Sequence, residues 1–209
     1  MTLSIDELDG KAEVTADLLV SAIRDGKLAD GICDSYTEIC NTVLKQFNVT
    51  PKKIGSDEKN RLFFELVCFP AFLIMGTMAE KQITKPHLLV MREPDVEGIR
   101  RYNDRLSEKL ISHLNRAGVT DVREITVLRM DPKMEFGQGE LLDFDRRIAD
   151  YLRLATTLEA AERFSMYIAF AVDPERYVEL KVLGAQFLKP ISLLADAIVK
   201  DVFGAITKK

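Results

Sequence analysis

The feature that most constrains this chain is the apolar segment 62–79, which reads LFFELVCFPAFLIMGTMA and contains a single charged residue, Glu65. A helix with this sequence would be apolar on every side. A membrane span needs about 20 predominantly apolar residues and a basic flank that sets its orientation. Here Pro70 and Gly76 interrupt the segment and Glu80 follows it. We therefore predict a helix that is kinked at Pro70 and forms the centre of a protein core, and we do not favour a membrane.

Amphipathic periodicity predicts further helices on both sides of this segment. They are expected at residues 5–25, 28–47, 94–117, 140–172, 174–188 and from 190 to the end. The predicted fold class is therefore mainly α: a multi-helix bundle around the central apolar helix. We expect one helical domain over residues 1–209, with a sub-boundary near 82–94.

Two short apolar runs, at residues 87–91 and 124–129, flank the predicted helix 94–117. Strand, helix, strand is the order of a βαβ unit, so one alternative is a small two-strand βαβ element near 86–130. The other alternative is helix throughout, because periodicity does not separate helix from strand in runs of this length.

The two runs end in similar sequences, VMREP and VLRMDP, in which an Arg is followed by an acid and Pro. If both are parallel strands, their carboxyl ends lie side by side, where ligands bind in open α/β sheets. Arg92 and Arg129 would then converge, with Lys133 near them, and could clamp a carboxylate or phosphate. The sequence thus suggests an anion site at these three residues. The alternative is that each Arg caps a strand or pairs with a surface acid.

No pattern in the chain predicts catalysis, a metal or a cofactor. Neither histidine follows a Glu at the spacing that di-iron bundles use, and the three cysteines lack metal-ligand spacing. Cys68 lies in the most apolar stretch, where the pKa of a thiol rises and its nucleophilicity at neutral pH falls. Gly137-Gln138-Gly139 precedes a predicted helix but lacks the Lys and third glycine of phosphate-binding loops.

Charge and cysteine use bear on location and partners. The net charge is −4 and the chain has no basic recognition helix, so nucleic acid is not favoured as a partner.

Arg101 and Arg105 share one face of helix 94–117, where Glu97 precedes Arg101 by one turn, and a salt-bridged solvent face is expected. The first residues lack a secretory pattern and the odd cysteine count gives no disulfide framework, which predicts a cytoplasmic protein.

Three functions fit these observations. The first is a non-catalytic interaction or assembly protein, homo-oligomeric through its last helix, with Val202 and Phe203 in the seam. The second is a sensor or binding protein for a small anionic ligand. Its apolar pocket would lie beside the helix kinked at Pro70, with Arg92 and Arg129 at its polar end. That pocket would be lined by Phe63, Phe64, Phe69 and Phe72. The third, least favoured, is a nucleic-acid-binding regulator.

Overall fold

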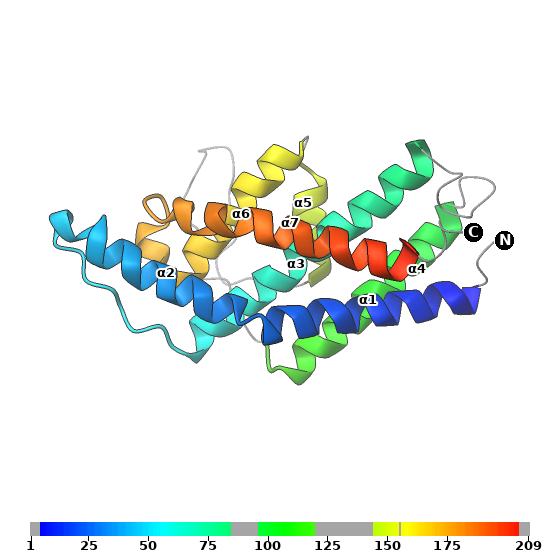
Figure 1. The fold of residues 1–209 in the computed structure, drawn as a ribbon, viewed down its shortest axis with the longest axis horizontal. Helices are drawn as coiled ribbons and strands as arrows, with labels where there is room; N and C mark the ends of the chain where they lie inside the picture. Colours follow the sequence, from blue (N-terminus) through cyan, green and yellow to red (C-terminus); the bar gives the residue numbers. More distant parts are fainter. Residues whose placement is uncertain (1–4, 85–95, 120–143, 155, 205–209) are drawn as a thin grey trace.

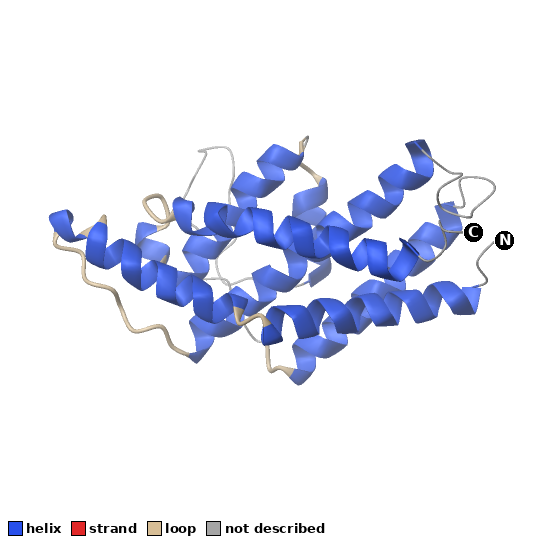
Figure 2. Ribbon diagram, viewed as in Figure 1, coloured by secondary structure: helices blue, strands red, loops and turns tan. Residues whose placement is uncertain are grey.

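The computed structural model describes residues 5–84, 96–119, 144–154 and 156–204. Every regular element in these ranges is a helix, and no strand occurs among them (Figure 2). The elements are α1 (Ile5–Asp25), α2 (Leu28–Thr42), η1 (Lys45–Phe47), α3 (Ser56–Thr84), α4 (Val96–Arg116), α5 (Phe144–Leu152), α6 (Thr157–Val172), η2 (Pro174–Arg176) and α7 (Lys181–Gly204).

The predicted helical bundle is confirmed, and α3 lies in its interior. The apolar segment 62–79 is part of this longer helix, which continues through Pro70. α3 and α7 are both long and apolar enough to cross a membrane by length and composition. The apolar stretch of α3 is 61% buried inside the protein, whereas that of α7 is 33% buried. Neighbouring helices therefore cover α3, as expected of a core helix.

Helices α1 and α2 lie nearly end to end along the long axis of the molecule, joined by a short elbow at Gly26 and Lys27, and α7 runs beside them (Figure 1). Gly26 sits in the elbow because the backbone folds back closely there: a Cβ atom at this position would lie 2.6 Å from the carbonyl oxygen of Ala22. The next residue, Lys27, adopts the left-handed conformation, with φ 48°. The sequence identified the break at Asp25-Gly26 but did not predict that Lys27 would adopt this conformation.

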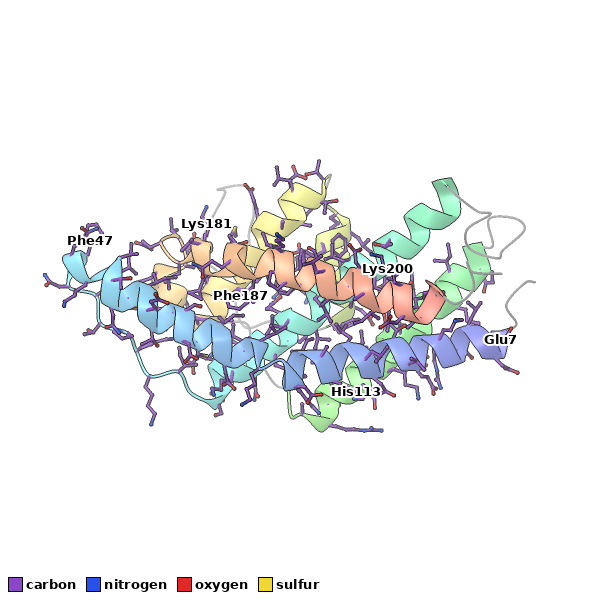
Figure 3. The ribbon with its side chains drawn as sticks, in the orientation of Figure 1. Glu7, Phe47, His113, Lys181, Phe187 and Lys200 are labelled. Atoms are coloured by element: carbon purple, nitrogen blue, oxygen red, sulfur yellow. The ribbon has the colours of Figure 1, made fainter. Side chains whose placement is uncertain are left out.

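A ladder of ion pairs joins α1 to α4 along their length. Arg101 donates to Asp9 at 2.9 Å, Arg105 to Glu13 at 2.6 Å, and Nε2 of His113 lies 2.8 Å from Asp17. Figure 3 shows His113 on the α4 face beside α1. Because both sets of residue numbers rise together, the two helices run parallel. Arg105 also pairs with Glu108 within α4 at 2.9 Å, so the salt-bridged face predicted for α4 is present and extends to α1.

The predicted βαβ element near 86–130 is not seen. Its helix is present as α4, but the two runs at 87–91 and 124–129 lie outside the described residues. The helix of a βαβ unit covers a sheet with its apolar face. That face of α4 packs in the helical core instead: Tyr102 is buried and its hydroxyl lies 2.9 Å from Thr15 Oγ1 on α1.

Several predicted helix boundaries are wrong. The helix expected at 28–47 ends at Thr42, and the helix expected at 174–188 begins only at Lys181, as part of α7. The helix expected at 140–172 is interrupted between α5 and α6, where Thr156 and Glu159 form a reciprocal capping box that starts a new helix. Pro190, expected to begin the last helix, instead lies inside α7. Its side chain is exposed, and flanking residues such as Leu183 and Ile191 are buried, so packing maintains the helix across the lost backbone hydrogen bond.

The end of α7, predicted as part of an oligomer seam, packs inside the chain. Val202 and Phe203 are 7% and 6% exposed. The Lys11 amine of α1 donates to the carbonyl of Val202 and lies 5.0 Å from the centre of the Phe203 ring. The Phe203 ring also meets Tyr102 of α4 edge-on, with ring centres 5.5 Å apart. These two side chains are therefore core residues.

Candidate functional site

The anion site predicted from the sequence, at Arg92, Arg129 and Lys133, lies outside the described residues.

Beside Pro70, aromatic rings fill the face of α3 where an apolar pocket was expected. Phe69 stacks on Phe164 with ring centres 4.4 Å apart, and Phe72 stacks on Tyr151 at 5.3 Å. A different pocket opens at the start of α3. Of the four phenylalanines expected to line a pocket, Phe63 is the one that lines this one.

This pocket, which we call the elbow pocket, is lined by residues of the α1–α2 elbow, of the first turns of α3 and of the segment just after α4. Its volume is about 300 Å³. Apolar and cationic side chains share its wall. The lining residues are Ile23, Arg24, Lys27, Ala29, Asp30, Lys59, Asn60, Phe63, Ala117 and Val119.

Three cationic side chains line the elbow pocket, each from a different element. Arg24 is in the last turn of α1, and its guanidinium carbon lies 5.2 Å from the centre of the Phe63 ring. Lys27 is in the elbow, and Lys59 is in the first turn of α3. Stacking on Phe63 restricts the Arg24 side chain without using its hydrogen-bond donors.

One carboxylate faces these cations. Asp30, in the first turn of α2, accepts a hydrogen bond from the Lys59 amine at 2.8 Å. This hydrogen bond from Lys59 lowers the pKa of Asp30, and the hydrogen bond to Asp30 raises the pKa of Lys59. Both groups are therefore charged at neutral pH. With three cations and one carboxylate, the lining has an excess of positive charge although the whole chain is acidic.

The backbone at Lys27 adds to the anion-binding character of the pocket. Lys27 precedes α2 and makes no side-chain hydrogen bond to cap that helix. The N-terminal end of a helix carries partial positive charge and favours anions. A residue other than glycine in the left-handed region costs roughly 1–2 kcal/mol. Such strain is often retained where the side chain has a function.

A second polar group, between α3 and α5, is buried. Arg147 donates to Glu65 at 3.0 Å, and both side chains are at most 7% exposed. The Arg147 guanidinium lies 3.6 Å from the centre of the Tyr167 ring. Tyr167 in turn donates to Asp150. These groups contact one another inside the core, so we interpret them as the polar link between α3, α5 and α6.

Sequence reasoning missed the elbow pocket because its residues are separated by up to 96 positions. The local signals were present: Asp25-Gly26 marked a break with Arg24 and Lys27 on either side of it. They did not reveal which side chains of α3 would approach that break.

Among the described residues, no group of three or more His, Cys, Asp or Glu side chains could hold a metal ion. Comparison of the chain with protein-family models, curated proteins and solved structures finds no match.

Proposed function

We propose that this protein binds a small anionic ligand that has an apolar body, and that it does so in the elbow pocket. The observation that carries the proposal is the convergence of Arg24, Lys27 and Lys59 on a pocket whose wall also includes Phe63 and Val119. Small-molecule sites combine apolar walls with a few fixed polar groups in this way, and their volumes begin at about 300 Å³.

The arrangement indicates how such a ligand would lie. Its anionic head would meet the guanidinium of Arg24 and the amine of Lys27 at the N-terminal end of α2. Its apolar part would lie against Phe63 and the apolar residues after α4. The volume suits a ligand of about one ring with a charged substituent, so benzoate and phenyl phosphate are suitable probes.

Isothermal titration with both probes tests the proposal, with benzyl alcohol as the uncharged comparison. We expect benzoate or phenyl phosphate to bind and benzyl alcohol to bind much more weakly. Replacing Arg24 with Ala should weaken binding about 5- to 10-fold, because a charge-assisted hydrogen bond contributes about 1.5–3 kcal/mol before solvent screening. A Kd above about 10 mM for both anions, less than about 3 kcal/mol of binding, would contradict the proposal.

A matched pair of glycine variants separates ligand binding from stability. Lys27 and Asn48 both have left-handed backbones, with φ 48° and 56°, and Asn48 does not line the pocket. Glycine at either position should raise the stability of the ligand-free protein, by up to about 1 kcal/mol, since it relieves backbone strain. Only Lys27→Gly should lose affinity for the anionic probe. Equal affinity of the two variants would exclude Lys27 from the site.

A second candidate function, assembly with another copy of this chain, is favoured by the outward face of α7. Lys189, Leu193, Asp196 and Lys200 recur at helical spacing and are exposed, and Leu193 is 58% exposed. In an antiparallel two-fold pair of α7 helices centred on Leu193, Lys189 would oppose Asp196 of the partner subunit. The face is thus complementary to itself, as a two-fold interface requires.

Light scattering after size-exclusion chromatography tests this second function. Leu193→Glu should convert a dimer to a monomer that keeps its helical circular-dichroism signal. Leu158→Glu, on α6, is the matched control, because Leu158 is 72% exposed and lies on a different helix. A monomeric unmodified protein, or a dimer that survives Leu193→Glu, would contradict this assembly.

A further inference from the structure

We infer that Asp30 sets the charge selectivity of the elbow pocket, so that the natural ligand carries a singly charged head such as a carboxylate. This inference rests on the proposed function. Its basis is the ion pair between Asp30 and Lys59 at 2.8 Å, in which two lining side chains satisfy each other. Because Asp30 pairs with the ammonium group of Lys59, that group is not available to a second negative charge on a ligand.

The remaining cations match a carboxylate. Arg24 presents a planar fork of donors that suits two coplanar oxygens, and Lys27 supplies a second positive charge. A phosphate ester at neutral pH carries nearly two negative charges and three acceptor oxygens. To use all three cations it must displace the Asp30 carboxylate from Lys59 and then lie close to a like charge.

The Asp30–Lys59 contact is suited to this competition because it is not locked in the core. The two side chains are 55% and 50% exposed, so either can turn away without leaving a buried charge. Exposed pairs contribute little to stability. Removing the carboxylate should therefore change ligand preference while the fold stays intact.

The experiment compares benzoate with phenyl phosphate by isothermal titration at about pH 7.5, where the phosphate is a dianion. In the unmodified protein we expect benzoate to bind at least as tightly as phenyl phosphate. In Asp30→Asn, phenyl phosphate should bind roughly three- to fivefold more tightly while benzoate changes by less than about twofold. Glu38→Gln, which removes an exposed charge two turns further along α2, should leave both affinities unchanged.

A double variant tests whether Asp30 acts through Lys59. In a Lys59→Met background, Asp30→Asn should no longer favour phenyl phosphate. If the same gain persists there, or if Asp30→Asn tightens both probes equally, Asp30 acts only as a general negative charge and the inference is overturned. Failure of both probes to bind any of these proteins would instead overturn the proposed function.

Discussion

Helices α6 and α7 approach each other closely at Gly184, and alanine at this position tests the packing of the bundle. A Cβ atom on Gly184 would lie 2.3 Å from the Cα and 2.9 Å from the carbonyl oxygen of Ser165. Both are backbone atoms in the middle of α6, so no side-chain rotation can relieve the contact. The two helices would have to separate by about 1 Å or more to restore ordinary packing.

The expected cost follows from that separation. Overpacking a core costs about 1–3 kcal/mol, which exceeds the gain of roughly 0.5–1 kcal/mol that alanine brings inside a helix. In a chain of this length each kcal/mol shifts the unfolding temperature by about 2–4 °C. We therefore expect Gly184→Ala to lower the midpoint of thermal unfolding by roughly 3–8 °C, measured by circular dichroism.

Gly31, inside α2, provides the matched control. A Cβ atom there would lie 3.7 Å from the ring of Phe187, which is ordinary van der Waals contact. Gly31→Ala should therefore raise the midpoint by about 1–4 °C through helix propensity alone. A Gly184→Ala variant as stable as Gly31→Ala would refute the close approach of α6 and α7.

Three further predictions concern the core and the α1–α4 ladder. Glu65→Gln should cost about 1.5–3 kcal/mol in urea unfolding, because the buried guanidinium of Arg147 then faces a neutral amide and keeps the Asp150 carboxylate at the longer distance of 4.0 Å, and Arg147→Met in the same chain should recover part of the loss. Phe203→Asp should unfold the chain in a far-ultraviolet circular-dichroism melt, since that ring is 6% exposed; a folded variant would contradict its place in the core. A hydrogen bond from Arg101 lowers the pKa of Asp9, so this pair stabilises the fold at neutral pH and the stabilisation is lost as the pH falls below about 4. The urea midpoint of Asp9→Asn should therefore fall less on acidification than that of the unmodified protein.

Much of the helical content could be predicted from the sequence because helix formation follows a local period. The first predicted helix, 5–25, coincides with α1, and the apolar segment 62–79 lies within α3. The predicted helix boundaries were wrong where tertiary packing overrode a local signal or where a continuous apolar period obscured one. Pro190 is a helix-start signal that packing of α7 overrides, and the capping box at Thr156 was hidden inside a continuous apolar period.

Apolar spacing depends only on neighbouring residues, so it was enough to predict that this chain is helical and that 62–79 forms its central segment. Which charged side chains pair with one another depends instead on how the helices pack. Arg105 pairs with Glu108 one turn along α4, yet it also reaches Glu13 on α1, and Arg101 reaches Asp9 there. Lys59 meets Asp30 because the α1–α2 elbow brings α2 against α3. Pairings across 29 or 92 positions depend on the direction of each helix, and that direction is set by the packing of the whole core.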